Sequence, residues 1–374
     1  MMSSAPHYAP IERVLADDGE LPRRRRSIVA NNADRVLTYL RRHHSGALSL
    51  VTAGKPADEV PAQDVSDVVY ALWLIGRSDL ITPNGTAAFA AHAGRLRLAG
   101  GLNAPADPRK TASVHLTAYI LGAANLLQAA GHDVSPAFAA AGDWRLHELF
   151  DEDLMPRWPA KWSHHSWRVS HWIGGAPSIL LSLNRLAPER CQEAGAPLLA
   201  DVLAASDALV DGDTGLLKAY RSRLLQSLFR NVYRIRHDPE VGDVGGIVHL
   251  HWINYAAGRL PYKAADALFD RAMALLERTP FIERTPYCLD FDVIQIARTA
   301  ATSAASTGDL RARADRLAAD LSAFFETQLS GDYGLHRLPG ALAAQHECAL
   351  ITGDREVRGL DTAPLDIIRA AGWI

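Results

Sequence analysis

Two kinds of helical segment alternate along the chain. In the first kind, apolar residues recur at helical spacing on one face only, as in residues 29–40. In the second kind, nearly every position is apolar, as in residues 64–80, and this pattern is typical of a helix buried on all sides. No long alternation of apolar and polar residues indicates a β-strand. The pattern therefore predicts an all-α protein.

The apolar helices are expected to form an inner layer, and a mostly amphipathic helix precedes each of them. They begin near Asp64, Thr111, His165, Gly245, Tyr287 and Gly340. Six hairpins of this kind predict a closed ring, an (α/α)6 toroid over residues 28–352. Residues 1–27 are expected to be a flexible lead-in, and residues 353–374 a tail packed on the outside of the toroid. The alternative is an open solenoid, but a solenoid repeats at a fixed period, and the spacings here vary.

The composition limits which binding partners and which cellular compartment we expect for the protein. Of the 374 residues, 48% are hydrophobic and 22% are charged, and the formal net charge is −3. This balance argues against nucleic acid and an anionic membrane surface as partners. No apolar run approaches the ~20 residues of a transmembrane helix, and no secretory signal pattern is present. Three cysteines fit reduced thiols in a cytoplasmic protein.

The helix alternation resembles the (α/α)6-toroid proteins, which include the six-hairpin glycosidase-like group and the related terpenoid-cyclase and prenyltransferase toroids. The turns at residues 212–217 (GDTGLL) and 331–336 (GDYGLH) are similar to the Asp-Gly turns that end outer helices there. The resemblance covers residues 28–352 and matches no single family. It implies sugar processing at the mouth of the ring, where the inner helices begin, with a saccharide or glycoconjugate as substrate.

Histidine, tyrosine and tryptophan residues interrupt the apolar helices and are candidates for substrate binding. On the third inner helix, Arg168 and His171 share a polar stripe, and Trp172 beside it could stack on a sugar. A His-x-x-x-Tyr pair occurs twice, and each pair lies on one helix face and could exchange protons. His249 lies on nearly the opposite face of its helix from His251, so both cannot point into the cavity. The further candidates are His115, Tyr119, His249, Trp252 and Tyr255.

Carboxylates near the beginnings of inner helices are candidates for catalysis. Asp290 and Asp292 diverge by about 200° around a helix, so one is expected to cap the helix and the other to face the cavity. The further candidates are Asp67, Asp213 and Glu347. Glycosidic cleavage needs two carboxyl groups about 5–9.5 Å apart. The leading hypothesis is therefore cleavage of a glycosidic bond without a cofactor, in which Asp290 or Asp292 pairs with a second carboxylate.

Three other hypotheses stay open. A uronate lyase or epimerase would use His251 or Tyr255 as its base and Arg168 to neutralise the substrate carboxylate. A zinc-dependent toroid enzyme would bind the metal through Cys288, His346 and Cys348, which are zinc-ligand types on neighbouring inner helices. A non-catalytic binding or assembly protein could use the same scaffold. The basic segment 216–237 is expected to be a solvated helix, a lid or a docking site.

Overall fold

The computed structural model describes residues 32–56, 59–95, 97, 102–104, 113–134, 149–150, 166–188, 196–218, 222–232, 238–260, 263–301, 304–353 and 364–374. The regular elements in these ranges are all helices. Strand-type pairing is limited there to two isolated bridges, one between Arg97 and Asn103 and one between Val210 and Leu217. The prediction of an all-α protein is confirmed. The predicted lead-in falls outside the described residues.

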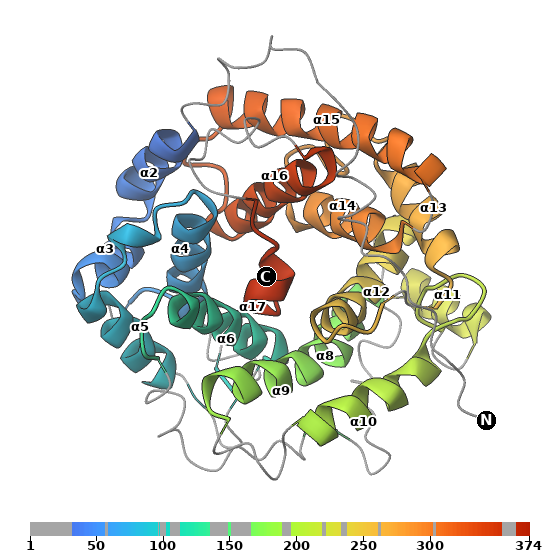
Figure 1. Ribbon diagram of the computed structural model, residues 1–374, viewed down its shortest axis with the longest axis horizontal. Coiled ribbons are helices and arrows are strands. Elements are labelled where there is room, and N and C mark those ends of the chain that lie inside the picture. The colour runs from blue at the N-terminus through green and yellow to red at the C-terminus, as the bar shows by residue number, and fades with distance from the viewer. Residues whose placement is uncertain are drawn as a thin grey trace.

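An inner layer of apolar helices surrounds the middle of the molecule (Figure 1). Its members are α4 (Ala62–Leu74), α6 (Val114–Ala129), α8 (Ser166–Ile173) with α9 (Gly175–Leu186), α12 (Pro239–Ala256), α14 (Cys288–Ala300) and α16 (Leu338–Thr352). Each member packs against the next one along the chain, and α16 packs against α4. The succession of contacts therefore closes on itself.

The amphipathic helices lie outside this layer (Figure 1). They are α2 (Asn32–His43), α3 (Ser45–Ala53), α5 (Pro83–Arg95), α10 (Ala196–Ser206), α13 (Ala265–Leu275) and α15 (Ala304–Thr327). Helices α3, α10, α13 and α15 pack respectively on α4, α9, α14 and α16. Short 3-10 turns, η2 (Ser78–Leu80), η5 (Asp207–Leu209) and η6 (Leu335–Arg337), connect some of these helices.

The inner helices approach one another closely because glycine occupies their contacts. A Cβ atom at Gly174 would lie 2.5 Å from the backbone carbonyl carbon of His249. A Cβ atom at Gly340 would lie 2.7 Å from the Cα atom of Cys288. Both distances are too short for a side chain, so only glycine allows these backbones to approach. These two contacts set α8–α9 against α12 and α16 against α14, around the candidate site.

The C-terminal tail corrects one expectation. Helix α17 (Ile367–Ala371) does not lie on the outside of the ring but inside the inner layer, against α6 and α12 (Figure 1). Trp373 beyond it is fully buried, and the Tyr70 hydroxyl donates a hydrogen bond of 2.7 Å to its carbonyl oxygen. The tail is too short for periodicity to distinguish an external apolar stripe from a segment that fills the centre.

The basic segment contains the predicted extra helix, α11 (Arg223–Val232), at the periphery (Figure 1). Among the described residues, the exposed large apolar side chains all belong to this helix: Leu224, Leu225, Leu228, Phe229 and Val232. Arg230 forms an ion pair with Asp243 at 2.5 Å. Arg221, Arg234 and Arg236 lie outside the described residues. Across the described part of the chain, no helix has the length and apolar content needed to cross a bilayer.

Candidate functional site

A cavity of about 360 Å³ opens among the inner helices, mostly where they begin. Its volume lies within the usual range of ligand pockets, ~300–1,000 Å³. Its lining combines aromatic, ionisable and small residues from every member of the inner layer except α9, together with the tail. These residues are Gln63, His115, Tyr119, Trp167, His171, His249, Trp252, Tyr287, Cys288, Asp292, His336, Pro339, Gly340 and Ile374.

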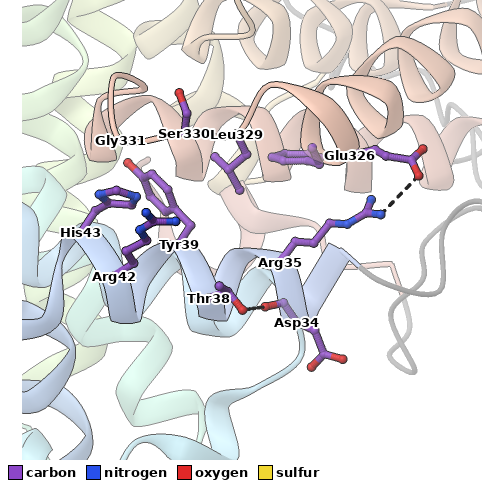
Figure 2. A pocket seen from close by; sticks show the side chains of 11 residues that line it. Asp34, Arg35, Thr38, Tyr39, Arg42, His43, Glu326, Leu329, Ser330 and Gly331 are labelled. Carbon is purple, nitrogen blue, oxygen red and sulfur yellow. Dashed lines mark hydrogen bonds and ion pairs between the residues drawn. The ribbon is translucent and has the colours of Figure 1, made fainter.

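A second pocket, of about 480 Å³, is an open groove between α2 and the end of α15 (Figure 2). Figure 2 shows Arg35 reaching across this groove to Glu326, with 3.2 Å between the charged atoms. Arg42 and His43 are exposed there. We place the chemistry in the smaller cavity, because only that one gathers buried ionisable side chains from several elements.

Three histidines from three inner helices meet in the cavity: His115 of α6, His171 of α8 and His249 of α12. One nitrogen of each ring can be chosen so that all three atoms lie within 4.8 Å of one another. The rings of His115 and His171 stack, with centroids 4.3 Å apart. The ring of His249 meets that of His171 edge-on at 5.0 Å. Of the predicted substrate-binding histidines, the structure therefore brings these three together.

A hydrogen bond to Ser170 fixes the tautomer of His249. The Ser170 hydroxyl lies 2.6 Å from His249 Nδ1 and also 2.6 Å from the carbonyl oxygen of Trp167. We assign the single proton of Ser170 to these carbonyl oxygens, of Trp167 and, at 3.1 Å, of Gly245, so that His249 Nδ1 carries a proton and donates it to Ser170. His249 Nε2 is then left with a lone pair. Burial lowers the pKa of both His249 and His115 well below the ordinary value, and neighbouring histidines add to this effect.

The tail packs directly against these histidines. Trp373 stacks on His249, with ring centroids 4.4 Å apart, and its indole nitrogen donates a 3.2 Å hydrogen bond to His115 Nδ1. Because indole can only donate, His115 Nδ1 is the acceptor and Nε2 holds the proton of the neutral ring. The tail therefore determines which nitrogen of His115 carries the proton.

Asp67 holds two cavity residues from behind. It is fully buried on α4, and its Oδ1 accepts a short hydrogen bond from the Tyr119 hydroxyl. The same oxygen lies 3.0 Å from His336 Nδ1. Burial opposes a charge on His336, but the Asp67 carboxylate outweighs burial and raises the pKa of His336. The bond to Asp67 places the Nδ1 proton of His336 toward the carboxylate, which leaves Nε2 able to exchange a proton.

Asp290 and Asp292 have different positions. Asp290 caps α14, because its Oδ2 accepts from the backbone N–H of Tyr287 at 3.0 Å and its Oδ1 from that of Ile282 at 3.0 Å. Asp292 lines the cavity, is 1% exposed, and its Oδ1 has no hydrogen-bond partner among the described residues. Burial, with a smaller effect of Asp290, raises the pKa of Asp292 well above the ordinary carboxyl value.

The second His-x-x-x-Tyr pair does not reach the cavity, which corrects the catalytic role expected for His251 and Tyr255. The Tyr255 hydroxyl donates to Asp366, just before α17, and accepts a 3.2 Å hydrogen bond from Arg298. His251 Nε2 lies 2.6 Å from the Thr299 hydroxyl. Tyr255, Arg298 and Asp366 belong to a buried network that attaches the tail to α12, α14 and α16, and His251 connects α12 to α14.

Glu347 belongs to the same network and is not among the cavity residues. Its carboxylate forms a two-pronged ion pair with Arg298, in which the second bond, from Nη2, measures 3.1 Å. Arg298 Nη2 also lies 3.0 Å from Asp366. Arg298 is 2% exposed and Glu347 is fully buried. Arg298 thus pairs with two carboxylates and neutralises part of their charge.

Of the remaining predicted residues whose side chains are described, Trp252 lines the cavity and Asp213 and Trp172 do not. Asp213 is exposed in the turn after α10, and Trp172 packs against the core without lining the cavity. Arg168 lies on α8, and the described part of the structure covers its backbone but not its side chain. Trp252 is buried at the cavity wall, as predicted.

The predicted zinc set is not assembled. His346 accepts a 3.0 Å hydrogen bond from the Leu365 backbone N–H at Nδ1, and its Nε2 lies 2.7 Å from the Leu74 carbonyl oxygen. Both ring nitrogens therefore bind backbone groups. Cys348 is buried away from the cavity, and only Cys288 lines it. Within the described residues, the side chains placed to hold a metal are instead His115, His171 and His249.

Three residues that matter here were not predicted as site residues: His336, Ser170 and Trp373. His336 lies in the turn directly before α16, so its position at the beginning of an inner helix was a usable signal. Ser170 and Trp373 gave none, because a serine in a helix and a tryptophan in a tail are ordinary core residues. Comparison with known proteins does not extend this list, since no family model, curated protein or solved structure matches the chain.

Proposed function

We propose that the chain is an (α/α)6 toroid enzyme that cleaves a glycosidic bond in the cavity at the inner-helix beginnings. One observation carries the proposal: Asp292, a buried carboxyl group whose Oδ1 has no hydrogen-bond partner among the described residues, faces the same cavity as a histidine held by a second buried carboxylate, His336 with Asp67. Asp292 is kept in its acid form and can give a proton, and His336 can take one at Nε2 whenever that nitrogen is deprotonated, so the two groups offer both roles of acid–base catalysis.

The proposed reaction is a single displacement by water. Asp292, in its acid form, gives its proton to the oxygen of the leaving sugar as the bond to the anomeric carbon breaks. Water attacks that carbon, and its proton passes to His336 Nε2. Asp67 does not touch the substrate and acts as a positioning residue that holds His336 Nδ1 at 3.0 Å. Trp167, at the cavity wall, offers an aromatic face on which a sugar ring can stack.

Asp292→Asn tests this role, since the amide fills the same space and cannot supply the proton. We expect the rate of glycan cleavage to fall by about 10²–10⁴-fold, the usual contribution of a general acid. Asp213→Asn, on an exposed turn, is the matched control and is expected to leave the rate unchanged. Equal rates in the two variants would exclude Asp292 as the acid.

A second candidate, β-elimination or epimerisation of a uronate, gains support from Tyr119. Its ring lies 5.2 Å from that of His336, and both side chains bind Asp67. An elimination would use this pair to remove a proton beside the substrate carboxylate. Tyr119→Phe separates the candidates, because it should abolish elimination while hydrolysis partly survives. Formation of an unsaturated product, measured by ultraviolet absorption, would favour elimination.

A further inference from the structure

We propose that His115, His171 and His249 form a binding site for a divalent metal ion that prefers nitrogen ligands, with zinc as the best match. The site lies in the same cavity as the proposed glycan reaction, but metal binding can be tested without a substrate. It also differs from the zinc set expected from the sequence, because it uses no cysteine. Its basis is the convergence of three imidazole rings from three separate helices.

The spacing of the rings suits a metal after a small movement. The three candidate nitrogens lie within 4.8 Å of one another. Around a tetrahedral zinc with Zn–N bonds of about 2.0–2.1 Å, ligand nitrogens are about 3.4 Å apart. Metal binding therefore requires side-chain rotations that bring these nitrogens up to about 1.4 Å closer and turn the stacked rings of His115 and His171 toward one ion.

The surroundings of His249 match those of a metal-binding histidine. Such a ligand usually donates its second ring N–H to a fixed acceptor, which sets the tautomer and the orientation of the ring. Ser170 is that acceptor for His249 Nδ1, at 2.6 Å. The Nε2 lone pair is then available as the ligand atom.

The cavity leaves room for a fourth ligand. Three protein ligands and one open position are typical of catalytic zinc, whereas structural zinc has four protein ligands. Asp292 is 1% exposed, lines the same cavity, and its Oδ1 has no hydrogen-bond partner among the described residues. This oxygen is an independent sign that the cavity receives a polar or cationic group, because a buried polar atom without a partner is costly.

Metal binding has a structural consequence at Trp373. The indole N–H donates to His115 Nδ1 at 3.2 Å, so Nε2 carries the proton in the metal-free state. When a metal replaces that proton at Nε2, the neutral ring carries its proton on Nδ1, and the indole hydrogen bond must break. We therefore infer that metal binding shifts Trp373 and changes its fluorescence.

The test is titration of the full chain, freed of metal with a chelator, by Zn²⁺ in a calorimeter and by Co²⁺ in an absorption spectrometer. We expect one ion per chain, a tetrahedral Co²⁺ spectrum and a change in tryptophan fluorescence at the same ratio. His171→Ala and His249→Ala should weaken binding by at least 100-fold. Ser170→Ala should weaken it by about 10–100-fold, as expected for a residue that orients a ligand.

His43→Ala is the matched control, since His43 is an exposed histidine in the groove beside α2. It should bind the metal as the unaltered chain does. Circular dichroism identifies any variant that fails to fold. If His171→Ala fails to fold, His171→Gln takes its place, because His171 is partly exposed and glutamine is close to histidine in size. The absence of stoichiometric binding, or equal affinity in the His171 variants and His43→Ala, would overturn the proposal. Metal binding without glycan cleavage would refute only the proposed reaction.

Discussion

His249 and His251 differ in position although the sequence makes them nearly equivalent. Both interrupt the same apolar helix, two residues apart, and both are buried. His249 lines the cavity, whereas His251 faces Thr299 outside it. The spacing correctly predicts that only one of them can face inward. A helix that is apolar all round carries no signal for its rotation, so the sequence could not show which one.

The Arg298–Glu347 pair gives a prediction at this scale. Glu347→Gln removes one of the two carboxylates that pair with a fully buried guanidinium, while Asp366 stays at 3.0 Å. We expect the free energy of unfolding to fall by about 3 kcal/mol, near the lower end of the range for a broken buried pair. Chemical denaturation measures this change. Asp213→Asn, which is exposed, should change it by less than about 0.5 kcal/mol, and a similarly small effect of Glu347→Gln would contradict the structural role.

The local position of a residue on its helix was easier to predict from the sequence than its partners in the fold. Asp290 and Asp292 divide into a cap and a cavity residue as their angular separation predicts. The partners of Asp67 depend on contacts over 52 and 269 positions of the chain. Local pattern contains no information about such contacts, so the connection of Asp67 to His336 could only come from the fold.

Among the elements, α17 carries the tail into the centre of the inner layer, where Trp373 and Ile374 meet the site. Its apolar residues and Trp373 fill the centre of the inner layer, and Asp366 begins the helix by accepting from the Arg369 backbone N–H at 3.1 Å. The sequence predicted a short helix here and placed it outside the ring. The burial of α17 at the centre could not be predicted, because the space inside the ring depends on how far apart the inner helices stand.

Removal of the Trp373 side chain should therefore destabilise the protein. Trp373→Ala leaves a cavity against His115, His249 and Trp252. We expect a loss of about 3–5 kcal/mol in unfolding free energy, as for other buried tryptophans. Thermal denaturation followed by circular dichroism measures it. An unchanged melting temperature would mean that the tail does not occupy the centre in solution.

Helix α11 gives the opposite prediction. Leu224 and Leu228 are 80% and 53% exposed, so they contribute little to the core. Changing both to serine should alter the unfolding free energy by less than about 1 kcal/mol, twice the limit for a single surface substitution. The same denaturation experiment checks this. A large loss would show that the apolar face of α11 is covered in solution.

At the scale of the whole molecule, one core joins all parts of the inner layer. Its buried apolar residues extend from α2 to the tail without interruption. The alternation of helix types predicted this layering, because it follows from burial of one face or of all faces. The exact rotation of each inner helix about its axis was not predictable, and that rotation determines which polar residues share the cavity.

A continuous core predicts one cooperative unfolding transition. Backbone circular dichroism and tryptophan fluorescence should report the same midpoint in urea, because no part of the inner layer can lose its neighbours alone. Trp373→Ala should move both curves together. Two separated transitions in the unaltered chain would instead indicate independent units.

The release of new reducing ends from a panel of oligosaccharides tests the central claim most directly. The unaltered chain, Asp292→Asn and Glu347→Gln are compared under the same conditions, at a temperature where circular dichroism shows all three folded. We predict cleavage of at least one oligosaccharide by the unaltered chain, loss of that cleavage in Asp292→Asn and its retention in Glu347→Gln. Cleavage that survives in Asp292→Asn but disappears in Glu347→Gln would contradict it, as would no release by the unaltered chain.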